Sequence, residues 1–260
     1  MLKTITTWAL LVALTLLPGT ARADSLSDLV HRADMVFRGK TSAAVFEMDV
    51  STKSYRRKFK IVSWDDSRGT DKALVKILGP AAWRGHATLK VGDKLKLYDP
   101  KTNHVQVVGH SMLGDSWMGS HFSNDDLVKE TRLARDYQLS LLKEWKGDAP
   151  VGDEATHYRV QMLPKPNAPV AWGKIVYELW DNDKGTAPLS AEYFRKASDK
   201  SPARTISFGD VKEMAGRYVP STMTVRLASK PGEFTTITYE KLKLDIAIPD
   251  SKFTEQAMKH

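Results

Sequence analysis

The stretch Ala43-Ala-Val-Phe-Glu-Met-Asp-Val50 decides the fold class, because apolar and polar side chains alternate along it with a period of two. Such alternation is typical of a strand that buries one face. After a short polar turn at 52–54, residues 55–64 alternate again around Phe59 and Ile61. The two runs together predict an antiparallel hairpin.

Similar runs continue along the rest of the chain, and most are joined by turns too short to hold a helical crossover. This pattern predicts an antiparallel sheet that curls on itself, with one apolar concave face. The strands that we expect are 44–50, 55–64, 73–78, 88–91, 94–98, 104–108, 137–145, 156–162, 174–180, 189–195, 204–210, 221–227 and 234–248.

The last of these runs changes phase part-way. Ile237 and Tyr239 follow one phase of the alternation, whereas Leu242 and the apolar residues after it follow the other. We therefore expect a β-bulge near Glu240 or Lys241.

Two segments have a helical pattern. Apolar residues between Leu26 and Phe37 recur at helical spacing, with Asp24, Ser25 or Ser27 as possible N-caps and Gly39 as the expected C-cap. Residues 111–127 interrupt the strand pattern, and Ser123 with Asp126 predicts a capped short helix there. These pieces are available to cover the mouth of the curled sheet.

The first 23 residues resemble an export signal. A charged start is followed by a short apolar run and by Ala21-Arg22-Ala23, which fits a cleavage site. We expect cleavage after Ala23, a single domain over 24–260 and a periplasmic location. Because the chain has no cysteine, we expect neither a lipid anchor nor a disulfide. The apolar run is too short for a permanent membrane span.

The formal net charge is +8, and loss of Lys3 and Arg22 with the leader lowers it to +6. Basic surfaces attract anionic partners, but the lysines and arginines are spread along the sequence. We interpret them as a solvated surface, and export argues against nucleic acid as a partner.

Several motifs, in their order along the chain, make the sequence resemble the LolA-like superfamily, in the branch of outer-membrane lipoprotein-sorting proteins. His121 stands where that branch is expected to have an acidic residue. The matching segments are Lys76–His86, Leu95–Pro100, Trp117–Leu127, Leu179–Leu189 with Glu192-Tyr193, Arg217–Pro220 and Ile248–Phe253.

The resemblance implies a mainly β fold with a helical lid, namely an unclosed antiparallel half-barrel of about 11 strands over an apolar cavity. It implies that acyl chains of a lipid or lipidated protein are carried, that an inner-membrane transporter of the RND type loads the carrier, and that an outer-membrane acceptor can receive the cargo. The resemblance implies no catalytic residue and no cofactor. We expect a monomer.

The residues expected to line the cavity are our own inference from the alternating positions and from the insert. Arg84, in the loop after Gly79-Pro80, is a candidate contact to a headgroup or to the lid. The lining candidates are Phe46, Met48, Phe59, Ile61, Val75, Ile77, Leu89, Leu95, Leu97, Val105 and Val107, with Trp117, Met118 and Phe122 from the insert. Each of them can equally be ordinary core.

Other kinds of site find little support. The histidines form no zinc motif, and no nucleophile elbow or phosphate-binding loop is present. The run Asp181-Asn-Asp-Lys-Gly185 lacks the closing glutamate of a calcium loop. The leading hypothesis is an acyl-chain carrier without catalysis. The alternatives are an accessory subunit of an envelope exporter that binds no lipid, and a hydrolase on a similar sheet.

Overall fold

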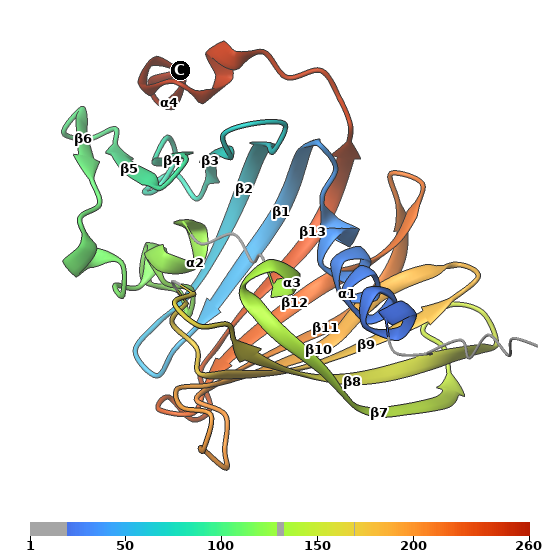
Figure 1. Ribbon diagram of the computed structural model, residues 1–260. Helices are drawn as coiled ribbons and strands as arrows, with labels where there is room; N and C mark the ends of the chain where they lie inside the picture. Colours follow the sequence, from blue (N-terminus) through green and yellow to red (C-terminus); the bar gives the residue numbers. More distant parts are fainter. Residues whose placement is uncertain (1–19, 129–132, 169) are drawn as a thin grey trace, which may run out of the picture.

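The computed structural model describes residues 20–128, 133–168 and 170–260, and its centre is one antiparallel sheet of 13 strands (Figure 1). The strand order is β6-β5-β4-β3-β2-β1-β13-β12-β11-β10-β9-β8-β7, so the sheet is not closed. The strands are β1 Thr41–Ser51, β2 Arg56–Asp66, β3 Lys72–Gly79, β4 Ala87–Val91, β5 Lys94–Asp99, β6 His104–Val107, β7 Tyr137–Asp148, β8 Glu154–Pro164, β9 Lys174–Asn182, β10 Gly185–Phe194, β11 Arg204–Met214, β12 Arg217–Leu227 and β13 Phe234–Leu244. The predicted class, a mainly β unclosed sheet with helices, is confirmed; its 13 strands match the 13 runs read from the sequence and are two more than the resemblance implies.

The chain builds this sheet in two halves. β1 to β6 form a meander in one direction, and the chain then crosses to β7 and returns strand by strand to β13, which pairs with β1. Val45 lies opposite Lys241 and Phe46 opposite Tyr239. Glu240 is therefore the extra residue, and the predicted bulge is confirmed.

The concave face of the sheet holds the main core. On β1 the residues Ala44, Phe46, Met48 and Val50 are buried, as the alternation predicts. Figure 1 shows the sheet curling around α1, which lies in its hollow and contacts β7, β9 and β10.

The helix α1 spans Thr20–Asp34 and runs into the 3₁₀ turn η1 at Met35–Phe37. It begins before the expected caps, so the predicted cleavage site at Ala23 falls within its first turn, and most of the predicted leader lies outside the described residues. Gly39 is not a helix cap. It is needed because a Cβ there would lie 2.5 Å from Oδ1 of Asp245.

Further helical segments lie between β6 and β7. They are η2 His110–Met112, η3 Trp117–Gly119, α2 Asn124–Val128 and α3 Leu133–Asp136. The predicted cap of α2 is confirmed, because Ser123 N–H donates to Asp126 Oδ2 at 2.8 Å and Asp126 N–H donates to Ser123 Oγ at 3.3 Å. We call residues 109–136 the insert.

The C-terminal segment corrects one prediction. β13 ends at Leu244 and not at Ile248, because Asp245 adopts a left-handed backbone with φ of 54°. The chain then crosses to the outer face of β3 to β5, where η4 (Asp250–Phe253) and α4 (Glu255–Lys259) pack (Figure 1). Ile248, Phe253 and Met258 form a second small core with residues of β3, β4 and β5.

One continuous sheet carries all strands of both halves, which supports the proposal that residues 24–260 form a single domain. No helix in the described part of the chain is both long and apolar enough to cross a membrane.

We expect Phe59→Ala to lower the free energy of unfolding by about 3–5 kcal/mol, because the ring is fully buried at the centre of the concave face. Urea unfolding monitored by circular dichroism measures the change. The control Val107→Ala, at a side chain that is 61% exposed, should change the value by less than about 0.5 kcal/mol. Equal effects of the two substitutions would contradict the described core.

Candidate functional site

Most of the predicted lining residues share the concave face. Phe46 lies opposite Ile61 and Met48 opposite Phe59, and the same phase continues across the sheet to β5. The residues that the register places on this face are Phe46, Met48, Phe59, Ile61, Val75, Ile77, Leu95 and Leu97.

Leu89 is a correction to this set. It lies opposite Leu74, and both belong to the outer core under the C-terminal segment. Val105 and Val107 point to the same outer face, because they pair with Tyr98 and Lys96 in the opposite phase to Leu97. Three of the lining candidates therefore cannot contact a ligand held on the concave side.

The concave face is filled in this structure. Met48, Phe59 and Ile61 are fully buried beneath other side chains of the protein. A cavity of about 110 Å³ next to α2 has a mixed lining that includes Asp65, Lys90 and Leu95. This volume is below the roughly 300 Å³ at which ligand pockets usually begin.

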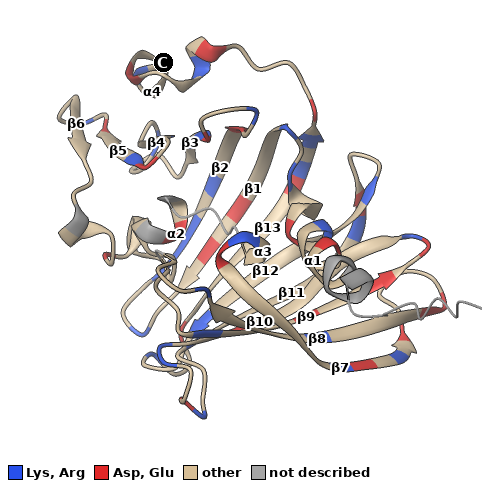
Figure 2. Cartoon of the chain, viewed as in Figure 1, with Lys and Arg blue, Asp and Glu red and all other residues tan. Residues whose placement is uncertain are grey.

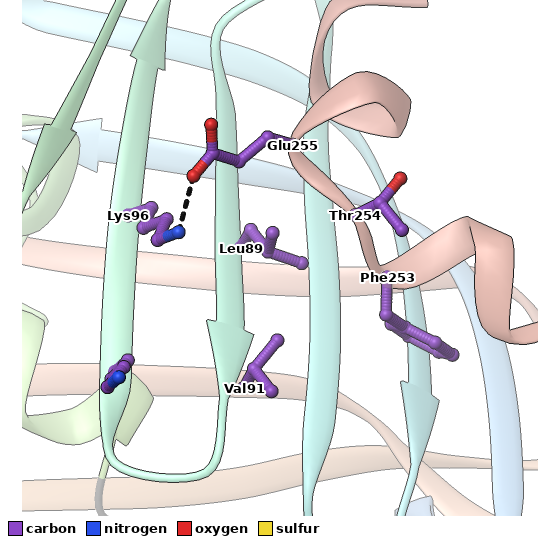
Figure 3. Close-up of a pocket in the computed structure, with 7 residues that line it drawn as sticks. Leu89, Val91, Lys96, Phe253, Thr254 and Glu255 are labelled. Carbon is purple, nitrogen blue, oxygen red and sulfur yellow. Dashed lines mark hydrogen bonds and ion pairs between the residues drawn. The ribbon is translucent and has the colours of Figure 1, made fainter.

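A larger cavity of about 250 Å³ lies on the opposite side of the sheet (Figure 3). Leu89 and Val91 of β4 face Phe253 across it, and Lys96 forms an ion pair with Glu255 at its edge. It is a gap between the sheet and the C-terminal segment, separate from the predicted site.

The lid α1 turns an apolar stripe toward the sheet. Leu29, Val30 and Ala33 of α1 are buried in the main core, and so is Val36 of the adjoining η1. On the outward side of the helix, Arg32 contacts Asp28, donates from Nε to Thr186 Oγ1 at 3.2 Å and pairs through Nη2 with Asp181 Oδ1 at 3.3 Å. The helix is thus held by apolar contacts below and by an exposed polar cluster above.

A second arginine holds the other end of the lid. Arg217 Nη1 donates to the carbonyls of Met35 at 3.2 Å and Arg38 at 2.8 Å, at the end of η1. Sequence reasoning did not assign this role, although Arg217 begins one of the motifs shared with the superfamily. Arg84 instead donates from its exposed loop to the carbonyl of Leu78 at the end of β3, and its predicted contact to a headgroup or to the lid stays a prediction.

The insert is fastened to the concave face. Trp117 is buried and donates from Nε1 to Thr88 Oγ1 of β4 at 3.0 Å. Met118 is half-buried in a left-handed turn with φ of 53°. The next residue must be glycine, because a Cβ on Gly119 would lie 2.7 Å from Oη of Tyr55, whose hydroxyl donates to the Gly119 carbonyl at 2.6 Å.

An ion pair between buried Arg204 and partly buried Asp126 joins α2 to β11. Arg204 Nη1 lies 2.6 Å from Oδ1 of Asp126, and the guanidinium lies over the rings of Phe122 and Tyr193. Asp126 therefore caps its own helix and anchors it. Phe122 is buried near this pair, so two of the three lining candidates from the insert, Trp117 and Phe122, belong to the packed core.

His121 fixes the insert to β13. Its backbone N–H donates to Thr235 Oγ1 at 3.0 Å, its Nδ1 lies 2.8 Å from the same oxygen, and its Nε2 lies 3.6 Å from Oε2 of Glu233. Burial lowers the pKa of His121, Lys230 acts in the same direction, and Glu233 opposes them. The neutral ring is thus favoured in the folded protein.

Two tyrosines, Tyr193 and Tyr239, pack against the main core. Burial raises the pKa of Tyr193 and of Tyr239 to about 12, so both stay protonated at neutral pH. Among the described residues, no three His, Asp or Glu side chains gather as a metal site.

The comparisons with known proteins agree with this architecture. A model of a family described as a "-like: Uncharacterized protein" matches residues 69–260, more than half of the chain. The chain belongs to this family. No curated protein matches its sequence significantly.

Solved structures identify the fold of this family member. A DUF1329 family protein from Desulfovibrio piger has a TM-score of 0.75 at 20% identity, covering 91% of this chain and 98% of its own. A putative outer membrane lipoprotein-sorting protein domain from Vibrio parahaemolyticus has a TM-score of 0.72 at 19% identity, with 92% and 100% covered. A LolA superfamily protein from Nitrosomonas europaea has a TM-score of 0.66 at 21% identity, with 90% and 98% covered. The predicted LolA-like fold is confirmed.

We expect Asp126→Asn to destabilise the protein by about 2 kcal/mol, because an asparagine can still cap α2 but leaves the buried Arg204 without its counter-charge. Chemical unfolding gives the free energy, and hydrogen exchange reports the opening of α2. The matched control Asp183→Asn removes an exposed pair with Lys184 and should cost less than about 1 kcal/mol. If the control costs as much, the pair does not anchor the insert.

The lowered pKa of His121 predicts a pH dependence of stability. The contribution of the neutral His121 ring to the free energy of unfolding is fully present above the unfolded histidine pKa of about 6.5. It is lost as the pH falls through the lower pKa of the folded protein. Between about pH 7.5 and about pH 5, the wild-type protein should therefore lose more stability than His121→Gln. Urea unfolding of both proteins across this range measures the difference. Parallel pH profiles would show that folding does not lower the pKa of His121.

Proposed function

We propose that the protein is a periplasmic carrier that encloses acyl chains of a lipid or lipidated protein on its concave face. The observation that carries the proposal is the lid. An apolar stripe of α1 covers an apolar sheet face, whereas the outward contacts that hold the helix are few, polar and exposed. Such a helix can be displaced without breaking the sheet.

The energetics support an exchange of lid for cargo. Burial of an acyl chain gains about 0.8 kcal/mol per CH₂, so a chain of about 16 carbons gains on the order of 10 kcal/mol. This gain offsets the loss of the contacts of Leu29, Val30 and Val36 when α1 moves. A filled face without cargo and an open face with cargo are then two states of comparable free energy.

The cellular role is a further part of the proposal. The N-terminal leader pattern supports export to the periplasm, and the relatives of the same fold include a lipoprotein-sorting domain and a LolA superfamily protein. We propose that an inner-membrane transporter of the RND type loads the carrier and that the cargo passes to the outer membrane.

One observation favours a second candidate, an accessory subunit of an envelope exporter that binds no lipid. That function predicts a filled half-barrel, and the concave face is indeed filled by Met48, Phe59 and Ile61. The two candidates differ in whether α1 leaves the sheet when acyl chains are present.

Uptake of a fluorescent fatty acid by the mature protein tests the carrier function, with native mass spectrometry of protein from its own periplasm to identify bound lipid. Arg32→Ala frees the outward side of α1 and leaves its apolar stripe intact, so we expect severalfold faster uptake. Arg56→Ala, which removes an exposed pair with Asp49 on the outer face, should leave the rate unchanged. If neither protein takes up the probe and the native mass carries no lipid, the exporter subunit becomes the better proposal.

A further inference from the structure

The topology of the sheet sorts its connections between two ends. Every strand is antiparallel to its neighbours, and neighbours within each half are consecutive in sequence, so successive connections leave at opposite ends. One end carries residues 52–55, 80–86, 100–103, 165–173, 195–203 and 228–233. The opposite end carries 67–71, 92–93, 149–153, 183–184 and 215–216.

Charge is distributed unequally between these ends. The connections of the first end hold eight lysines and arginines, against Asp199 and Glu233 as acidic residues. The opposite connections hold Arg68 and Lys184 against four aspartates. Figure 2 shows the blue segments at the hairpins of the lower left. We call the first set the basic rim; it consists of Lys53, Arg84, Lys101, Lys165, Arg195, Lys196, Lys200 and Lys230.

Ion pairs compensate little of the charge of the basic rim within the described residues, although Lys101 is among the groups that lower the pKa of Asp99. All eight residues are exposed, and none of them forms an ion pair with a carboxylate of the described residues. Lys165 and Arg84 donate to backbone carbonyls instead. At the opposite end, Lys184 pairs with Asp183 and Arg68 with Asp66.

Hydrogen bonds and a ring contact join five of these six connections into one surface. Gly173 N–H donates to the Phe194 carbonyl at 3.0 Å, and Ala228 N–H to the Ala203 carbonyl at 2.9 Å. Lys53 N–H donates to Glu233 Oε1 at 3.4 Å. These bonds connect four successive connections, from 165–173 to 52–55, and the surface continues to 80–86 because the Arg57 guanidinium lies 5.3 Å from the Trp83 ring.

Aromatic rings stand among these cations. The Arg195 guanidinium lies 4.4 Å from the ring of half-buried Trp172, and Arg57 lies 4.1 Å from the ring of Tyr55. Tryptophan and tyrosine beside lysine and arginine are typical of surfaces that sit at lipid headgroups. The cations are spread over flexible side chains of six connections, which suits a diffuse layer of phosphates better than a shaped protein epitope.

We propose that the basic rim docks the protein onto anionic phospholipid headgroups of a membrane surface. The inference goes beyond the carrier function, since it concerns a surface that acyl-chain enclosure does not use. Docking by this end orients the open half-barrel with the insert, which His121 and Thr235 fix near the same end, close to the bilayer.

Vesicle flotation tests the proposal with the mature protein. We expect binding to phosphatidylcholine vesicles that contain about 30% phosphatidylglycerol, no binding to phosphatidylcholine alone, and release by salt. The variant Lys53→Gln, Lys196→Gln, Lys200→Gln and Lys230→Gln should bind at least about tenfold more weakly.

The matched control carries Lys94→Gln, Lys146→Gln, Lys184→Gln and Lys212→Gln, four exposed lysines at or near the opposite end, and lowers the net charge equally. It should bind within about twofold of wild type. Equal weakening of both variants, or no binding of wild type to anionic vesicles, would overturn the proposal, as would binding only to an acidic protein. Fatty-acid uptake without vesicles, measured on the same samples, separates this outcome from a failure of the carrier function.

Discussion

The pairing of β1 with both β2 and β13 is the constraint on which the rest of the structure depends. It joins the first and last strands of the chain, with Met48 opposite Phe59 on one side and opposite Ile237 on the other. Without it the two meanders are separate sheets, each with an apolar face open to water. The bulge at Glu240 keeps the apolar residues of β13 on the concave side across the phase change.

A sheet with one apolar face must cover that face, and this protein covers its concave face with α1 and the insert. The insert is fastened by directional contacts, the Arg204–Asp126 pair and the Trp117 hydrogen bond. The lid α1 has an apolar underside and polar contacts to side chains at its exposed edge. On the proposed function, this contrast makes α1 the element that leaves the sheet and the insert the element that stays.

The two faces of the sheet have different occupants. The concave face packs against α1 and the insert, whereas the outer face of β3 to β5 packs against the C-terminal segment through Leu74, Phe253 and Met258. Elsewhere the outer face carries paired charges such as Lys58 with Glu47 and Lys60 with Glu240. The two proposals therefore use different parts of the molecule, the apolar concave face for acyl chains and the basic rim for headgroups.

The sequence by itself determined the fold class, most strand positions, the bulge near Glu240 and the cap formed by Ser123 and Asp126. These are local features, since a period of two and the spacing of a capping box can be read within a few residues. Only the tertiary structure decided that Leu89 faces outward, that Arg217 holds the lid, and that lysines scattered in sequence form one basic rim. Each depends on which strands are neighbours and on which end their connections leave, and a pattern within one strand carries no information about the strand beside it.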